Sequence, residues 1–170
     1  MRINPTSLWH RVKVPLIVLF LATTVIIAYY PGLRGPFVFD DSVHIVDNPS
    51  VRISTLDLAG LSRAGFSDDA EILQRPLAKM SFALNYYFSG EKLDPYSFKV
   101  TNLIIHLLNA SLVYWFIALL LRQLQTRSKI TVGGTDRWIP MLATALWTLH
   151  PIQLTSVLYV VQRMNSLSAF

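Results

Sequence analysis

Two long apolar runs without a charged residue constrain this chain more than any other feature. The first extends from Val14 to Tyr30, and the second covers Leu103 to Leu121 inside a longer segment, 97–121. A helix rises about 1.5 Å per residue, so each run is long enough to cross a bilayer. Hydrophobic residues make up 52% of the chain, and its mean hydropathy is +0.42. The sequence therefore predicts an all-α membrane protein.

Two further apolar runs are shorter. The run from Trp138 to Leu149 ends at His150-Pro151 and would rise only about 18 Å as a helix, less than the bilayer core of about 30 Å. A span here would therefore have to include flanking residues or pack among other helices. Leu167 to Phe170 opens another run. We therefore expect the N-terminal part of a longer polytopic bundle, with about three transmembrane helices here. A cleaved signal peptide is the alternative for the first run, although no small-x-small site precedes Tyr29-Tyr30.

The distribution of charge predicts the orientation of these runs. Residues 31–96 hold six basic and nine acidic residues, a net charge of −3, whereas the rest of the chain carries +8. Basic residues cluster before the first run and between the second and third, at Arg2, Arg11, Lys13, Arg122, Arg127, Lys129 and Arg137. Basic loops stay in the cytoplasm, so residues 1–30 are expected to form a cytoplasmic start and the first span, and residues 31–96 an external loop. The second span would then cover 97–121, a cytoplasmic loop 122–137 and the third span 138–150. Residues 151–170 would form an external segment that leads into a further span.

The external loop is too long for a bare connection, so it should contain structure of its own. Ser54 is suited to cap a short amphipathic helix over 55–63, and a clearer amphipathic helix is expected from Arg75-Pro76 to Ser89-Gly90. The second helix lies on the membrane surface, packs over the helix bundle, or covers the loop as a soluble helix. The residues leave all three possibilities open.

An adjacent acidic pair, Asp40-Asp41, follows the first run by about ten residues. Two neighbouring carboxylates that both stay ionised must be solvated or face a cation. In a membrane protein such groups usually mark a substrate path or a catalytic acid or base. The alternative is a solvated turn, which Asp residues favour. The pair is therefore a candidate site at the outer end of the first span.

The second run carries a polar stripe. Lys99, Asn102, His106 and Asn109 recur at helical spacing, so all four project from one face. Polar groups that face lipid are costly, and this face should therefore point into a helix bundle or a wet cavity. Hydrogen bonding between packed helices is an equally good interpretation of the stripe.

Several other chemistries receive no support from the residues. His106 and His150 each stand without a second ligand at ligand spacing, and the chain has no cysteine, so we expect no metal site. Gly133-Gly134 lacks the surroundings of a nucleotide-binding loop, and no other cofactor is expected. The basic residues follow membrane topology rather than one exposed aromatic face, so nucleic acid is not an expected partner.

A series of short motifs resembles one family. In order they are Phe39-Asp40-Asp41, Asp47-Asn48-Pro49 with Val51-Arg52, Arg75-Pro76-Leu77, Asn85-Tyr86, Asn102-Leu103-Ile104-Ile105-His106-Leu107-Leu108-Asn109, and His150-Pro151-Ile152-Gln153 with Val157 and Arg163. Together they are similar to the transmembrane and tetratricopeptide-repeat O-mannosyltransferases and their bacterial relatives. The resemblance covers nearly all of the chain from Tyr30 onwards.

This resemblance implies a polytopic GT-C glycosyltransferase that takes a sugar from a polyprenyl-phosphate carrier and transfers it to a protein or glycan hydroxyl on the non-cytoplasmic side. It implies that Asp40 is the general base and that Asp41 supports it or orients the acceptor. The leaving lipid phosphate needs cations, for which Arg75 and Arg163 are the candidates, and His150 would bind that phosphate or fix the turn at Pro151. No metal is implied.

One departure from the family pattern is clear. Many members carry a glutamate shortly after His-Pro, whereas Leu154-Thr155-Ser156 has none. The resemblance places the protein in a membrane among lipids, in the bacterial inner membrane or alternatively in the endoplasmic reticulum. Two other functions remain open: a non-catalytic membrane scaffold of the same fold that carries C-terminal repeats, and an unrelated transporter with an acidic vestibule.

Overall fold

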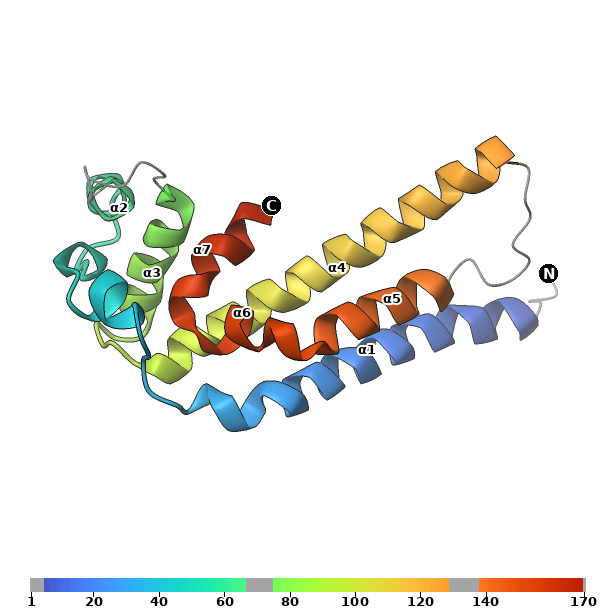
Figure 1. Ribbon diagram of the computed structural model, residues 1–170, viewed down its shortest axis with the longest axis horizontal. Helices are drawn as coiled ribbons and strands as arrows, with labels where there is room; N and C mark the ends of the chain where they lie inside the picture. Colours follow the sequence, from blue (N-terminus) through green and yellow to red (C-terminus); the bar gives the residue numbers. More distant parts are fainter. Residues whose placement is uncertain (1–4, 67–74, 129–137, 170) are drawn as a thin grey trace.

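Two long helices and a shorter one lie side by side along the molecule in the computed structural model, which describes residues 5–66, 75–128 and 138–169 (Figure 1). They are α1 (Pro5–Leu33), α4 (Pro95–Ser128) and α5 (Trp138–Leu149). Within the described ranges all regular structure is helical. Helices α1 and α4 run in opposite directions, and α5 packs against both. The expected all-α class is therefore confirmed.

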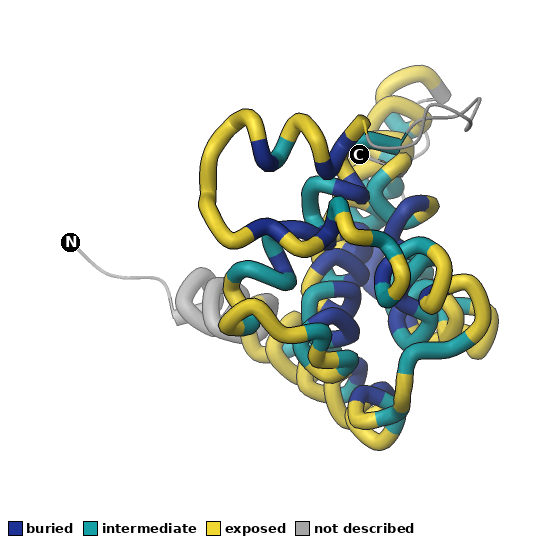
Figure 2. The backbone as a smooth tube through the Cα atoms, turned by 90° about the vertical axis from the view of Figure 1, so that its left-hand side faces the viewer, coloured by how far each residue is buried: buried dark blue, intermediate teal, exposed yellow. Residues whose placement is uncertain are grey.

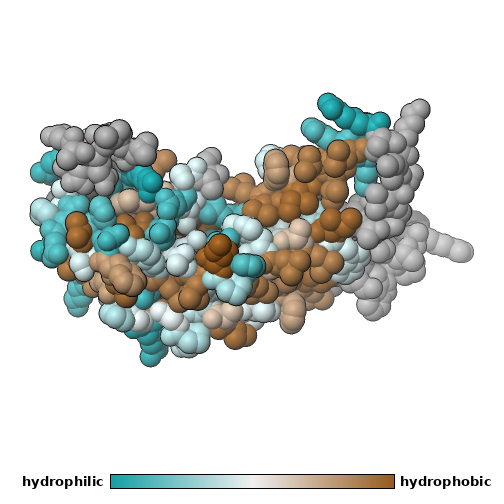
Figure 3. Space-filling view, viewed as in Figure 1, coloured by the Kyte–Doolittle hydropathy of each residue, from teal (hydrophilic) through white to brown (hydrophobic). Residues whose placement is uncertain are grey.

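Two of these helices are long and apolar enough to cross a membrane, over Pro15–Leu33 and Pro95–Arg127. Their outer faces carry large exposed apolar side chains, such as Phe20 and Phe116, and Figure 3 shows hydrophobic surface over this part of the molecule. Helix α5 is apolar but has only 12 residues. The third span and the GT-C bundle are therefore still predictions, whereas two candidate spans are a finding.

Helix α4 extends beyond the expected second span at both ends. It begins after Asp94, whose carboxylate oxygens each accept from a backbone N–H in its first turn, from Tyr96 and Ser97 at 3.2 Å. It ends at Ser128 rather than at Leu121. The charged residues near each end limit the apolar run but not the helix, because lysine and arginine are good helix formers.

The polar segment between α1 and α4 folds into a loop lobe, which we define as η1 (Ser42–Val46), η2 (Pro49–Val51), α2 (Leu58–Gly65) and α3 (Pro76–Phe88). Helix α2 begins later than expected because its first turn is capped by Asp57, which accepts from the Gly60 N–H at 2.7 Å, and not by Ser54. Helix α3 begins at Pro76, as the sequence predicts. Figure 3 shows that hydrophilic surface gathers over this lobe.

Helix α3 covers a hydrophobic core between the loop lobe and the rest of the chain. Its Ala78 and Phe82 pack with one residue from each of five other elements, Ile45, Val51, Phe98, Val160 and Met164. Leu77 and Phe88 lie on the other face and are 70% and 73% exposed. Its buried face therefore packs over the loop lobe and also against α4, whereas a position of its exposed face on the membrane surface is still a prediction.

The chain after α5 is a broken helix that turns back over α4. It consists of η3 (Pro151–Gln153), α6 (Leu154–Leu158), η4 (Val160–Gln162), α7 (Arg163–Ser166) and η5 (Leu167–Ala169). Pro151 ends α5, because proline cannot continue the backbone hydrogen bonding of a helix. Tyr159 adopts an extended conformation, φ −99° and ψ 107°, and separates α6 from η4. Helix α7 consequently contacts both α3 and α4 (Figure 1).

The orientation predicted from the charges leads to a direct experiment. A reporter fused after Gly90, in the loop lobe, should lie outside the cytoplasm, and one fused after Lys129 should lie inside, because basic loops are retained there. Lys129 lies outside the described residues. Protease protection of both fusions in sealed vesicles provides the measurement. Reversed accessibility would place Asp40 in the cytoplasm and contradict transfer on the outer side.

Candidate active site

The two carboxylates of the acidic pair point in different directions. The preceding residue, Phe39, has a left-handed backbone with φ 47°, which an aromatic residue rarely adopts. After this turn the Asp40 side chain is exposed, whereas Asp41 is completely buried. Adjacent residues of one sequence motif are thus in opposite environments.

Asp41 ties the acidic turn to the chain after α6. Its Oδ2 accepts from the Val38 N–H at 3.1 Å and from the Val160 N–H at 3.4 Å, and its Oδ1 accepts from the Val161 N–H at 2.7 Å. Burial raises the pKa of the Asp41 carboxyl, while these three hydrogen bonds and the charge of Lys99 oppose the rise. Asp41 therefore holds two segments together that are 119 or more residues apart.

Lys99 fixes the chain just before the acidic turn. Its Nζ donates to the carbonyl oxygens of Gly35 and Pro36 at 2.8 and 3.0 Å, and the side chain is only 3% exposed. A Cβ at Gly35 would lie 3.1 Å from this Nζ, so the close approach favours glycine. Lys99 and Asp41 together anchor both ends of the 35–41 segment.

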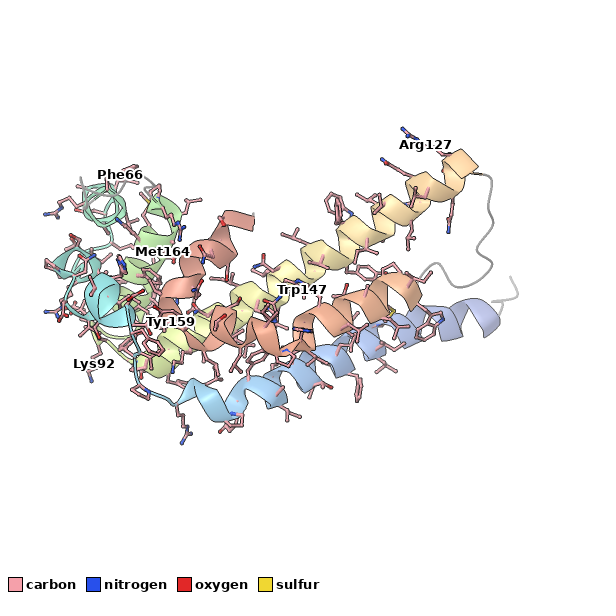
Figure 4. The ribbon with its side chains drawn as sticks, in the orientation of Figure 1. Phe66, Lys92, Arg127, Trp147, Tyr159 and Met164 are labelled. Atoms are coloured by element: carbon pink, nitrogen blue, oxygen red, sulfur yellow. The ribbon has the colours of Figure 1, made fainter. Side chains whose placement is uncertain are left out.

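Tyr159 contacts both residues of the exposed part of the turn. Its hydroxyl accepts from the Asp40 N–H at 3.2 Å, and its ring meets the Phe39 ring edge-on, with centroids 5.9 Å apart. Burial raises the pKa of the Tyr159 hydroxyl, and the neighbouring Asp40 carboxylate raises it further. Figure 4 labels Tyr159 where the chain after α5 meets the loop lobe.

Arg163 is the centre of a buried polar network. Its Nε donates to Asn102 Oδ1 at 2.7 Å, and its Nη2 donates to Asn85 Oδ1 at 2.9 Å and to the Phe98 carbonyl at 2.8 Å. Its Nη1 donates to the Ser81 carbonyl at 3.2 Å and to Ser81 Oγ at 3.3 Å. These bonds join α7 to α3 and α4. Every nitrogen of the guanidinium thus has a partner within the protein.

The surroundings of Arg163 fit a cation that stays charged. The guanidinium carbon lies 4.7 Å from the Phe82 ring centroid and 5.6 Å from that of Phe98. Burial lowers the pKa of Arg163 to about 9, and the charge of Asp41 opposes this fall. Arg163 is therefore protonated at neutral pH although no part of it reaches the surface.

Arg75, unlike Arg163, is only partly buried. It precedes the first turn of α3, and its Nη1 donates to Asn165 Oδ1 at 2.8 Å. The amide nitrogen of Asn165 donates in turn to Gln162 Oε1. Among the described residues, a single amide oxygen occupies one nitrogen of the Arg75 guanidinium, which leaves further donors for an anion.

His150 has a local role in the structure. Its Nδ1 accepts from the Ile152 N–H at 3.2 Å and caps η3, and the side chain is exposed. Of the two roles considered for His150, binding a phosphate and fixing the turn at Pro151, this contact corresponds to the second. The ring keeps its second nitrogen for another contact.

The polar stripe of α4 is buried along its whole length. Figure 2 shows that buried residues gather on the helices at the centre of the molecule. Besides Lys99 and Asn102, the stripe includes His106, whose Nε2 lies 3.1 Å from the Thr148 carbonyl. The Asn109 side-chain N–H donates to the Ser166 carbonyl at 3.1 Å. The stripe therefore joins α4 to the chain just after α1, to α5 and to the chain after α6.

The described ranges contain no group of three or more His, Cys, Asp or Glu side chains that could hold a metal ion. The candidate groups are thus an exposed carboxylate on an anchored turn and a partly buried arginine, each in contact with the chain after α6. Such a set can accept a proton and bind an anion.

Sequence reasoning missed the residues that connect these groups. Tyr159 and Asn165 stand in an ordinary apolar and polar context, and their partners Asp40 and Arg75 are 119 and 90 residues away. Asn85 belongs to a motif noted in the sequence, yet nothing there indicates that it meets Arg163. Only the fold brings these residues together.

The chain is thus helical, with two helices long and apolar enough to cross a membrane and a polar lobe next to an anchored acidic turn. Comparison with known proteins gives its relatives. It is 31% identical to the human protein O-mannosyl-transferase TMTC4 over 157 residues, which is 89% of this chain and 21% of the relative. It is 30% identical to mouse TMTC1 over 87% of this chain and 15% of the relative.

A third relative, Tmtc3 of Drosophila melanogaster, is 26% identical over 89% of this chain and 17% of its own length. The chain resembles the TMTC O-mannosyltransferases along most of its length, which confirms the resemblance inferred from the motifs. It spans about a fifth or less of the relatives that it matches. No family model and no solved structure matches it.

Proposed function

We propose that this chain carries part of the active site of a glycosyltransferase that moves a sugar from a polyprenyl-phosphate carrier to a protein or glycan hydroxyl. The observation that supports this most is the division within the acidic pair. Asp40 is exposed on a turn that Asp41 anchors by accepting three backbone N–H groups. A general base needs such a fixed yet accessible carboxylate.

The proposed step is a displacement at the anomeric carbon of the donor sugar. Asp40 takes the proton of the acceptor hydroxyl as that oxygen forms the new glycosidic bond. The bond between the sugar and the phosphate breaks, and its electrons leave with the lipid phosphate. The hydroxyl is a poor nucleophile until its proton is accepted, so the base lowers the barrier.

The leaving phosphate needs a cation, and Arg75 fits this role better than Arg163. Arg75 is only partly buried and its described partner is a neutral amide, whereas all nitrogens of Arg163 donate within the protein. A guanidinium binds phosphate oxygens through two parallel N–H groups. We therefore propose Arg75 for the donor phosphate and assign Arg163 to the frame around the site. His150 keeps its proposed phosphate contact through its free ring nitrogen.

The names of the relatives suggest mannose as the sugar and a protein as the acceptor. We propose transfer on the non-cytoplasmic side, as the charges predict. The relatives compared above come from animals, which favours the endoplasmic reticulum over the bacterial inner membrane that the sequence suggested first.

The test supplies membranes that contain the protein with mannosyl polyprenyl phosphate or with nucleotide-linked mannose, both radiolabelled. Label should reach protein from the lipid donor alone. Membranes without the protein are the control. If neither donor labels an acceptor while the protein is intact and correctly oriented, the chain serves as a scaffold.

Arg75→Lys should raise the concentration of lipid donor needed for half-maximal transfer roughly tenfold, because the charge stays while the planar fork is lost. Folded yield should not change. The matched control is Arg52→Lys, an exposed arginine of the loop lobe that donates to the Val46 carbonyl at 2.7 Å. Equal donor dependence in both variants would leave Arg75 as a structural partner of Asn165.

A further inference from the structure

The geometry points to Tyr159 as the positioning residue of Asp40, an inference that rests on the proposed function. Its hydroxyl accepts from the Asp40 N–H at 3.2 Å, and its ring meets the Phe39 ring edge-on with centroids 5.9 Å apart. One side chain thus contacts the backbone of Asp40 and the residue before it. These contacts fix the backbone from which the Asp40 carboxylate projects and leave its oxygens for the proton of the acceptor.

The backbone of the acidic turn needs such support. Phe39 is left-handed, with φ 47°, and its side chain is 83% exposed, so burial of that side chain contributes little to holding the turn. A strained backbone persists only where the surroundings determine it. The Tyr159 ring, 5.9 Å from the Phe39 ring between centroids, and the Tyr159 hydroxyl are the contacts that meet the turn on its exposed side.

The same short segment holds both acids. Directly after Tyr159, the N–H groups of Val160 and Val161 donate to Asp41. The extended backbone at Tyr159 separates α6 from η4 and leaves these N–H groups outside the regular helical pattern. Tyr159 therefore sets Asp40 from the exposed side while the next two residues fix Asp41 from the buried side.

The decisive variant is Tyr159→Phe, which keeps the ring contact and removes the hydroxyl. We expect kcat for sugar transfer to fall on the order of tenfold or more, because the base loses its orientation. KM for the lipid donor and for the acceptor should stay within about twofold, since neither contacts Tyr159 in the proposed step. The matched control is Tyr96→Phe, because Tyr96 is an exposed tyrosine in the first turn of α4.

A combined variant separates positioning from a structural role. In the Asp40→Asn background, Tyr159→Phe should cause almost no further loss, because there is no base left to position. A multiplicative further loss would show that Tyr159 acts independently of Asp40 and would overturn the inference. If Tyr159→Phe is poorly folded, Phe39→Leu provides the second test, since it removes the ring contact and should lower kcat without changing KM.

Failure of this inference differs from failure of the proposed function. Parental kcat in Tyr159→Phe, with Asp40→Asn inactive, would overturn the role of Tyr159 alone. Parental activity in Asp40→Asn would remove the base and with it both proposals.

Discussion

Replacing Asp40 with asparagine should lower sugar transfer about 100-fold or more, the scale typical of losing a general base. Asparagine has nearly the same shape but cannot take the proton of the acceptor hydroxyl. Because the Asp40 side chain is exposed, folding should be unaffected. The measurement is the initial rate of transfer from a saturating lipid donor in membranes, normalised to the amount of folded protein.

Asp47→Asn is the matched control, because Asp47 is an exposed acid of the same lobe. It should transfer sugar at the parental rate. Asp41→Asn should behave differently from both, since its amide N–H₂ would face backbone N–H groups that now donate to a carboxylate. We expect a lower folded yield there. Parental transfer by Asp40→Asn would show that Asp40 is not the base.

Arg163→Lys should destabilise the protein by about 3–5 kcal/mol, the range for breaking a buried charged network. Lysine keeps the charge but has three donors on one atom, so it cannot reach Asn102, Asn85 and the Phe98 carbonyl together. The unpaired acceptors would stay buried. The thermal unfolding midpoint in detergent measures the change.

Arg75→Lys provides the control for this second experiment, because Arg75 is only partly buried and should give the parental midpoint. The pair also separates the two roles first expected for these arginines. If Arg163→Lys is as stable as the parent but needs more lipid donor, Arg163 binds the donor phosphate and the network is secondary.

The residues from 159 to 165 organise the site more than any loop motif does. Within this stretch Tyr159 contacts Asp40, Asn165 contacts Arg75, and Arg163 joins α3 to α4. The broken helix after Pro151 makes this possible, because a continuous helix would leave its N–H groups unavailable to Asp41. We therefore expect function to be sensitive to changes in this segment even where they are conservative.

Local signals in the sequence predicted much of the fold correctly. Uncharged apolar runs predict α1 and α4, because the length and composition of such a run are enough to indicate a helix that is buried or faces lipid. Pro76 predicts the start of α3, since proline suits the first turn. The start of α2 was less well predicted because Ser54 and Asp57 are both good caps, and only the packed backbone selects Asp57.

What the sequence by itself determined is the inventory of the site: an acidic pair after an apolar helix, candidate arginines, and a polar stripe on one helical face. Only the tertiary structure decided which of the two aspartates and which of the two arginines is accessible to a substrate. Asp40 is exposed and Asp41 is buried, although they are neighbours of one residue type. Arg75 keeps donors for an anion, whereas Arg163 uses its donors within the fold. The physical reason is that burial and hydrogen-bond partners come from segments between 61 and 120 residues away, which no local pattern encodes.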